Sequence, residues 1–566
     1  MIKRRKGTTY LLELLTDVII IGGGGAACRA AIEAADSGAS VVLVTKLTPT
    51  KAGATCYPVA EMAGYNAGNP VICHDVEKHY MDIVSAGQGM ADPKLAAIVA
   101  SKAPNTIEQL EKWGVHYERE NGDYYIFKSC FSNYPRTHVI RGHGEPIVSA
   151  MLKQIQMRPQ IKIISDGTVI GLLMHNGFCR GAWGYITAGE KFIIHSGAVV
   201  MATGGSTQAF ERNLSPNDVT GDGYSLGFEA GADLVNMEFM QIGIGFVKPV
   251  TNIFNGYIWA GLPTLVNGFG TAFLDRYVPP QITARDVMYE HRKHFPFSSS
   301  DHSKYLEIAI QGEIADGRGT ENNAVIVDLS NLTDDYVKNI KDDCGIHHMW
   351  PVTREYLGSK GVDVMNTPME ICCFAHAING GLKIDENAMT TIPGLFAAGE
   401  VAGGPHGADR LGGNMMVTCQ VFGAIAGARA AIWAVLNRAD KIGKDSNSEA
   451  KEYLLRKNIN AWGMMKELQK LNQRNLLVGR TESGLNQVLE TVKLINSQIE
   501  SSPCGNQVEL DNFALHSELQ VTNFIAYAAR LRKESRGSHH RSDYEQRDET
   551  FCKPQIINNT MKDIQL

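Results

Sequence analysis

A glycine-rich turn near the start of the chain has the residue types and spacing needed to hold a dinucleotide. The residues Gly22-Gly-Gly24-Gly-Ala-Ala27 fit the pattern G-x-G-x-x-G/A. Gly22 permits a tight turn, Gly24 lets the backbone approach a pyrophosphate, and Ala27 lets a helix and a strand pack closely. The phosphates would then lie at a helix N-terminus. Because ordinary glycine-rich turns can show the same pattern, the motif needs support from other parts of the chain.

The elements predicted around this turn are those that such a site requires. Residues 18–21 are predicted as a buried strand, residues 26–35 as an alanine-rich helix and residues 40–44 as a second strand, which together form a βαβ unit. The acidic residue that usually grips the adenosine ribose after the second strand is absent, because Thr45 and Lys46 stand there. This absence disfavours a simple NAD-binding domain.

Three later segments carry further dinucleotide-type signals. They are ATGG at 202–205, TGDG at 220–223 and GLFAAGE ending at Glu400. A single NAD domain needs only the first turn, whereas FAD is extended and buried and is held by segments far apart in sequence. FAD is therefore the cofactor that we infer.

Longer motifs make the chain similar to one family of flavoproteins. It resembles the flavoprotein subunit of the succinate dehydrogenase/fumarate reductase family, which also includes L-aspartate oxidase and adenylylsulfate reductase. The resemblance covers nearly the full length. It is carried by TKLTPTKAG at 45–53, TGDGYSLGFEAGADLVNMEFMQ at 220–241, LDRYVPPQITARDV at 274–287, HAINGG at 376–381, HGADRLGGN at 406–414 and ESRGSHHRSDYEQRD at 534–548.

The resemblance implies an α/β fold with three parts. A Rossmann-like FAD-binding domain is interrupted by an α+β capping domain and followed by a C-terminal helical domain. The irregular stretch from Gly243, rich in aromatic residues and proline, fits the inserted cap, and amphipathic patterns after a polar linker fit the helices. The expected ranges are 1–242 and 365–440 for the FAD-binding domain, 243–364 for the cap and 441–566 for the helical domain.

The family's flavin-linking histidine is replaced in this chain. Its motif RSHT falls at Lys51-Ala-Gly53-Ala54, so we expect FAD to be bound non-covalently. Met415 and Met416 are expected to pack under the flavin ring. The residues expected to bind the cofactor are Gly22, Gly24, Gly25, Ala26, Ala27, Thr45, Lys46, Ala52, Gly53, Ala54, Thr203, Gly204, Asp222, Glu400, Arg410, Asn414, Met415 and Met416.

The resemblance also implies a mechanism and three catalytic residues. Flavin N5 exchanges a hydride with a substrate carbon while the arginine of the RDV motif, here Arg285, exchanges a proton. Arg410 and His376 correspond to the residues that hold substrate carboxylates. Arginine suits this task because its planar fork binds a carboxylate through two hydrogen bonds. Outside such motifs, arginine and histidine at domain interfaces are most often structural.

Two departures from the family pattern predict a different substrate. The substrate-binding histidine after MEFxQ is missing, because Gln241 is followed by Ile242-Gly243-Ile244. The family's segment TEGxRGEGG is replaced by residues 255–264, so that Tyr257 or Trp259 occupies a position where the family has a charged residue. A buried second carboxylate would lack partners. We therefore expect neither fumarate nor succinate, but a larger molecule with one carboxylate and an apolar or aromatic portion.

Composition excludes several other classes of protein. The 566 residues are 44% hydrophobic and carry a net charge of -6, which disfavours nucleic-acid binding. The 11 cysteines are scattered and form no metal-binding pattern, and His539-His540-Arg541 is expected to dock the C-terminal domain, so no metal site is expected. An iron-sulfur or other electron-transfer centre would sit on a partner chain.

The sequence predicts a cytoplasmic protein without a membrane span of its own, although a partner could hold it at a membrane. No run of 18 apolar residues occurs, and the basic start at 3–6 fits a twin-arginine signal less well. The favoured reaction is interconversion of a carbon-carbon single and double bond next to a carboxylate. Two alternatives stay open: amine oxidation of the aspartate oxidase kind, and a flavin electron-transfer subunit without a small-molecule substrate. The sequence names neither the substrate, the direction, the electron partner nor the oligomeric state.

Overall fold

A computed structural model describes residues 11–186, 189–437, 451–561 and 564. Its α/β domain is built on a seven-stranded sheet in the order β8-β2-β1-β11-β10-β9. β11 pairs with β1 on one side, and on the other with β10 and, through its last residues, with β19. The strands are β1 (Leu11–Ile21), β2 (Val41–Val44), β8 (Ile161–Ile164), β9 (Gly167–His175), β10 (Phe178–Ile186), β11 (Lys191–Met201) and β19 (Leu395–Ala397).

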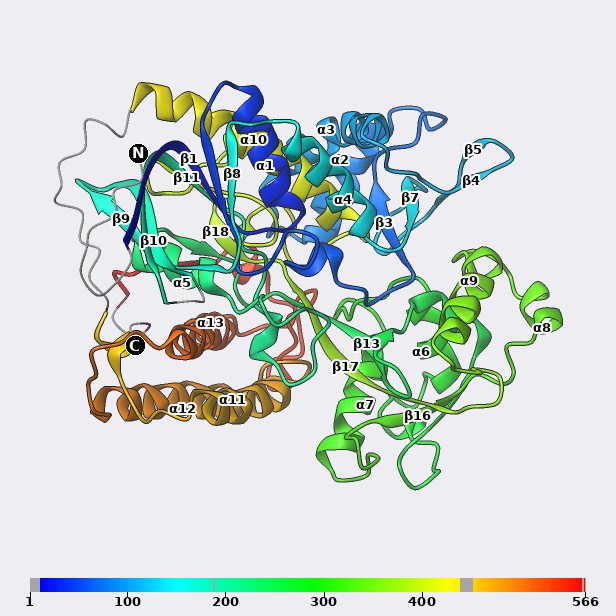
Figure 1. Cartoon of the computed structure of the whole chain (residues 1–566). Coiled ribbons are helices and arrows are strands. Elements are labelled where there is room, and N and C mark those ends of the chain that lie inside the picture. The colour runs from blue at the N-terminus through cyan, green and yellow to red at the C-terminus, as the bar shows by residue number, and fades with distance from the viewer. Residues whose placement is uncertain (1–10, 187–188, 438–450, 562–563, 565–566) are drawn as a thin grey trace.

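Two helices lie side by side over this sheet (Figure 1), α1 (Gly25–Asp36) and α10 (Asn414–Leu436). Their backbones meet closely, since a Cβ on Gly427 would lie 2.2 Å from the carbonyl oxygen of Ala30. α10 is the one helix among the described residues that is long and apolar enough to cross a membrane, judged by length and composition alone. Its contacts with α1 and β11 are those of a core helix of the α/β domain.

The cap is an α+β domain, as expected. Its sheet has the order β14-β13-β17-β16-β15, and β13 and β17 are the two strands that extend from the α/β domain into it (Figure 1). β13 crosses the boundary expected at 242/243, whereas β17 begins at Met369, after the boundary expected at 364/365. The bounds are β13 (Met240–Lys248), β14 (Asn252–Ile253), β15 (Thr264–Val266), β16 (Val325–Asp328), β17 (Met369–Ile378), α6 (Ala284–His291), α7 (Lys304–Ala315), α8 (Asp334–Lys338) and α9 (Ile346–Ser359).

The C-terminal domain is helical, as predicted. α13 (Leu510–Leu531) packs against α11 (Ala461–Asn475) and α12 (Glu482–Ser501), and almost every residue of α13 is buried. The expected boundary at 440/441, like the basic start at 3–6, lies outside the described residues. After α13 the tail returns to the α/β domain, where β21 (Ile556–Ile557) pairs with β12 (Leu234–Val235).

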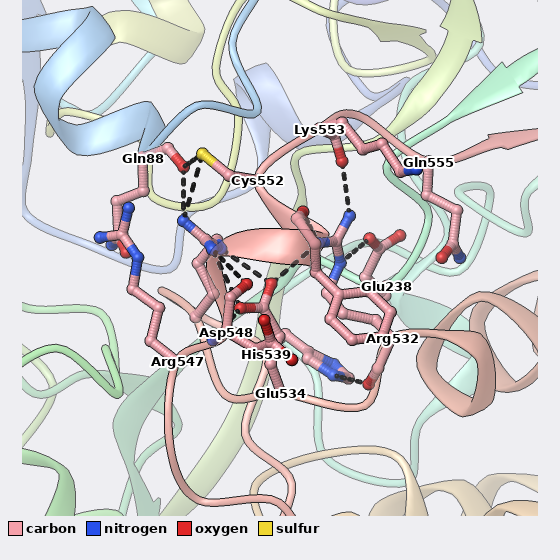
Figure 2. A network of polar contacts seen from close by, with 12 residues as sticks. Gln88, Glu238, Arg532, Glu534, His539, Arg547, Asp548, Cys552, Lys553 and Gln555 are labelled. Atoms are coloured by element: carbon pink, nitrogen blue, oxygen red, sulfur yellow. Dashed lines mark hydrogen bonds and ion pairs between the residues drawn. The ribbon is translucent and has the colours of Figure 1, made fainter.

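A buried network of charges fastens this tail to the rest of the chain (Figure 2). Glu534 accepts hydrogen bonds from Arg532 at 2.9 Å and from Arg536 at 2.8 and 2.9 Å. Arg532 also donates to Glu238 of the α/β domain at 2.6 Å. His539 is fully buried and contacts Arg480 through Nδ1 at 2.6 Å. Burial lowers the pKa of His539 well below its usual value, so the imidazole accepts this bond as a neutral group.

Candidate active site

One large cavity lies between the α/β domain and the cap. On one side it is lined by the turn after β1, by the 3₁₀ turn η1 (Ala54–Cys56) and by the first residues of α10; on the other side the cap contributes residues 253–257 and 292–296. It brings together most of the residues that the sequence singled out. Those that line it are Gly22, Gly24, Gly25, Ala26, Thr45, Lys46, Gly53, Ala54, Thr203, Gly204, Asp222, His376, Glu400, Arg410, Met415 and Met416.

Three residues expected to bind the cofactor lie behind the cavity wall instead. Ala27 and Ala52 are buried, and a Cβ on Gly23 would lie 2.7 Å from the Cβ of Ala52. Asn414 is buried and accepts a hydrogen bond at 2.8 Å from the amide of Asn66. These side chains support the wall and do not line the cavity.

The end of the cavity next to β1 and β2 fits a dinucleotide. Gly22 has φ 129°, and a Cβ there would lie 2.1 Å from the carbonyl oxygen of Ala202, so only glycine is accommodated. Lys46 stands after β2 and pairs with Asp222 at 2.7 Å. Two buried polar atoms of the wall, Thr203 Oγ1 and Asp218 Oδ1, have no hydrogen-bond partner among the described residues. Since buried polar atoms are nearly always hydrogen-bonded, these are free to receive a polar ligand.

Arg410 places a buried positive charge at the other end of the cavity. Its side chain donates to the Oε1 of Gln241 at 2.9 Å and to the carbonyl oxygen of Leu411 at 3.2 Å, and no carboxylate of the described residues forms an ion pair with it. Burial lowers its pKa to about 10, although nearby Glu400 acts in the opposite direction. A buried cation without a counter-ion is costly, so this position favours an anionic ligand.

His376 lines the same end of the cavity. Burial, together with the charge of Arg410, lowers its pKa to about 3, so the imidazole is neutral at ordinary pH. Its Nδ1 has no hydrogen-bond partner among the described residues. A neutral imidazole can offer one N–H to a ligand oxygen and accept at the other nitrogen.

An aromatic ring occupies the space beside Gly243. A Cβ on Gly243 would lie 2.1 Å from Cζ of Phe295, and the edge of that ring faces His376 with centroids 5.2 Å apart. Tyr257 also lines the cavity, with its hydroxyl bonded to Thr353. Trp259 is buried in the core of the cap instead, against Phe254. Of the two aromatic residues considered for residues 255–264, Tyr257 is therefore the one at the cavity.

Comparisons with known proteins agree with this geometry. Residues 17–416 match the FAD binding domain family, and residues 465–566 match the fumarate reductase flavoprotein C-terminal family. The chain belongs to the succinate dehydrogenase/fumarate reductase family of flavoproteins. L-aspartate oxidases are among its relatives, and an adenylylsulfate reductase shares its fold. It is therefore an FAD-dependent oxidoreductase, and the inference of FAD from separated sequence segments is confirmed.

Two relatives align with this flavoprotein over almost their whole length. An uncharacterized FAD-dependent oxidoreductase of Methanocaldococcus jannaschii is 32% identical over 95% of both chains. One subunit of the fumarate reductase (CoM/CoB) of Methanothermobacter marburgensis is 29% identical over 96% of this chain and 97% of the relative. Among solved structures, Sdh1 of Mycobacterium smegmatis has a TM-score of 0.77 at 26% identity. The alignment covers 95% of this chain and 90% of the Sdh1 chain.

Arg285 does not line the cavity of this flavoprotein in the structure. It is exposed in the first turn of α6, whose buried residues are Val287, Met288 and His291. Its assignment as the proton-exchanging residue stays a prediction. The residues next to α6 that line the cavity come after the helix ends, in the segment 292–296.

Sequence reasoning missed several cavity residues that can do chemistry. Cys130 and His143 line the cavity and lie in the predicted first part of the FAD-binding domain. Neither belongs to any of the motifs quoted above. His294 of the cap donates to the carbonyl oxygen of Pro296 at 2.8 Å and pairs with Asp301 at 3.0 Å. The positive φ of His143, 59°, is not visible in a sequence, and the contacts of Cys130 arise only when the cap folds over it.

Proposed function

We propose that this flavoprotein interconverts a carbon-carbon single and double bond next to the carboxylate of a molecule larger than a four-carbon diacid. The observation that carries the proposal is Arg410, a buried cation at the cavity without a carboxylate partner among the described residues. A substrate carboxylate would supply the missing negative charge, and Gln241 would keep the guanidinium oriented toward it. His376, neutral and unpartnered at Nδ1, would offer a hydrogen bond to the same carboxylate.

The rest of the pocket supports a substrate with an apolar or aromatic body. The cavity residues from the cap and from the loop before Cys130 include the apolar and aromatic side chains of Phe127, Ile253, Tyr257, Phe295 and Met349. Polar and charged side chains, among them Lys128, Lys293 and His294, line the same part of the cavity. Arg292 is already neutralised by Asp343 at 2.6 Å, so it does not provide a second free carboxylate site. Such walls exclude water and favour burial of an apolar group.

Bound FAD supplies the exchange of a hydride with a substrate carbon. The chain's own residues then have separate tasks. Arg410 and His376 fix the carboxylate, which places the adjacent carbons at the boundary between the α/β domain and the cap. Phe295 and Tyr257 enclose the body of the substrate. Precise orientation of this kind is a large part of enzymatic rate enhancement.

The proposal is tested by flavin absorbance under anaerobic conditions. Oxidised protein is mixed with saturated acids, and dithionite-reduced protein with the corresponding unsaturated acids, the panel including arylalkanoic acids, amino acids and diacids. We expect monocarboxylates with an apolar body to change the flavin absorbance quickly in at least one direction. Rapid bleaching by L-aspartate followed by fast reoxidation in oxygen would favour amine oxidation instead. Bleaching by no acid would contradict the proposal.

We further propose that the electrons leave to a separate iron-sulfur or other electron-transfer protein. Several relatives are named as subunits, which supports assembly with other chains. All 11 cysteines are free, and the described residues contain no group of side chains able to hold a metal ion. A cytoplasmic location remains part of this proposal.

FAD is expected to leave the protein completely on acid precipitation. Gly53 stands where the family has its linking histidine and carries no nucleophile, so no covalent bond is expected. The measurement is the flavin absorbance of supernatant and pellet after trichloroacetic acid treatment. Yellow colour in the pellet would contradict non-covalent binding. His143→Ala would then show whether that cavity histidine, with its unpartnered Nδ1, forms the bond.

A further inference from the structure

We infer that a second cavity, where the α/β domain, the cap and the helical domain meet, binds a small dianion that also carries a hydrogen-bond donor. The cavity has a volume of about 270 Å³ and is lined by residues of α7, β17 and α11 (Figure 1), together with Glu211 and Arg212 of the α/β domain. It shares no lining residue with the active-site cavity. Typical ligand pockets measure about 300–1,000 Å³, so this space suits a metabolite of a few carbon atoms. The inference concerns a separate site and does not depend on the proposed function.

The side chains around this second cavity carry a surplus of positive charge. Arg212, Lys470 and Arg474 are cations, whereas Glu211 is the one carboxylate among the described residues that line it. None of the four forms an ion pair with another described residue. Lys470 and Arg474 are four residues apart on α11, so their side chains lie on the same face of the helix. The surplus of two positive charges in a concave site attracts anions, and a dianion would balance it.

Arg212 is held in place by both of the other domains. Its backbone N–H donates to Oε1 of Gln473 on α11 at 3.1 Å, and its guanidinium donates to the carbonyl oxygen of Asn322 in the cap at 2.7 Å. Its own carbonyl oxygen accepts from the N–H of Ala375 on β17 at 2.9 Å. The rest of the guanidinium has no hydrogen-bond partner among the described residues. A guanidinium that is already oriented can bind a carboxylate or a phosphate through two hydrogen bonds with little loss of side-chain entropy.

Gln311 of α7 supplies an acceptor for the donor group of the ligand. Its side-chain N–H donates to the carbonyl oxygen of Arg474 at 3.1 Å, which fixes the orientation of the amide. Its Oε1 is buried and has no hydrogen-bond partner among the described residues. Buried polar atoms are nearly always hydrogen-bonded, so a hydroxyl or amine of the ligand would complete this site.

A ligand in the second cavity would contact all three parts of the chain. Gln311 belongs to the cap, Lys470 to the helical domain and Arg212 to the α/β domain. Cys372 of β17 lines the same cavity, and burial raises the pKa of its thiol to about 12. The thiol is therefore neutral at ordinary pH and does not repel an anion. Because the cavity exists only when the three parts are assembled, a bound dianion stabilises the folded chain.

The first test measures binding to the FAD-loaded, full-length protein by isothermal titration calorimetry. Glycerol 3-phosphate and tartrate are the probes, because each carries hydroxyl groups beside a phosphate or a pair of carboxylates, and sulfate is the dianion without such a donor. We expect at least one probe to bind saturably at one site per chain, about tenfold more tightly than sulfate. The probe that binds more tightly identifies the anionic group. Saturable binding of neither probe, or equally tight binding of sulfate, would overturn the inference.

The second test assigns the binding to this cavity. Lys470→Gln and Arg212→Gln should each weaken binding of the tighter probe by about tenfold or more. Lys466→Gln is the matched control, because it removes the same charge one turn earlier on α11 from an exposed position that does not line the cavity. Arg410→Met, in the active-site cavity, should bind the probe as wild type does. Equal effects of Lys466→Gln and Lys470→Gln, or loss of binding in Arg410→Met, would overturn the inference.

The third test uses thermal unfolding with and without the tighter probe. Gln311→Glu keeps the size of the side chain but adds a negative charge at the acceptor position, so it should abolish the binding of a dianion. The probe should raise the unfolding temperature of wild type and leave that of Gln311→Glu unchanged, which makes each protein its own reference. A rise of equal size in both proteins would overturn the inference.

Discussion

Replacing Arg410 with methionine is expected to lower kcat/KM for the acid substrate by about 10²- to 10⁴-fold while the protein keeps its FAD. Removing one partner of a buried charge pair costs about 3–5 kcal/mol, and each factor of ten in rate corresponds to about 1.4 kcal/mol. Without the guanidinium, a substrate carboxylate would be buried with only His376 beside it. Steady-state kinetics and the flavin content of the purified variant measure both parts of the expectation.

The ligand-free Arg410→Met protein should unfold at a temperature close to that of wild type. Its guanidinium has no carboxylate partner among the described residues, so removing it also removes a buried unpaired charge. Arg285→Gln tests the other arginine predicted from the sequence: a loss of several orders of magnitude in turnover would support proton exchange by Arg285, and a nearly unchanged kcat/KM would remove it from that role. Loss of FAD from Arg410→Met would show that this arginine holds the cofactor and not the substrate. Turnover above a tenth of wild type would remove it from the substrate site.

The turn at Gly22 shows why the cofactor site could be predicted from the sequence. The features that bind the dinucleotide there are local in sequence, because a strand, a tight turn and a helix N-terminus follow one another along the chain. The segment at 202–205 and the segment that ends at Glu400 add their signals independently. Ala27 and Ala52 are buried and do not line the cavity, and a Cβ on Gly23 would lie 2.7 Å from the Cβ of Ala52. The division into an α/β domain, a cap and a helical domain was also predictable, because each part has its own pattern of hydrophobic residues.

Arg285 shows what a local motif does not specify. The letters RDV match a motif, but the role of the arginine depends on which part of the cap faces the cavity. Here α6 ends at His291, and the chain turns through residues 292–303 before α7 begins. That turn brings Phe295 to the cavity and leaves the start of α6 exposed. The contact between Phe295 and Cys130 joins residues 165 positions apart, so no local pattern could reveal it.

The protein is expected to discriminate against fumarate and succinate by about 10³-fold or more in kcat/KM, relative to an acid with an apolar body. One carboxylate of the diacid can bind Arg410, but the other would face Phe295 and Tyr257. A buried carboxylate without partners is penalised more strongly than a missing methylene group. The comparison is made with reduced protein and paired unsaturated acids at equal flavin concentration.

Gly243→His should not restore fumarate reduction, although it returns the family's histidine. A Cβ at Gly243 would lie 2.1 Å from the ring of Phe295, so the new side chain can enter only if that ring moves. The variant should therefore also lose activity toward its own acid, because the displaced ring forms the wall against the substrate body. Combining Gly243→His with Phe295→Ala provides space for the new histidine. This double variant separates the effect of crowding from the effect of missing polar contacts, because residues 255–264 still lack the family's charged groups. If the unmodified protein reduced fumarate at about 10 per second, a rate typical of enzymes, its pocket would have to hold a second carboxylate beside Phe295, and the aromatic wall could not set the specificity.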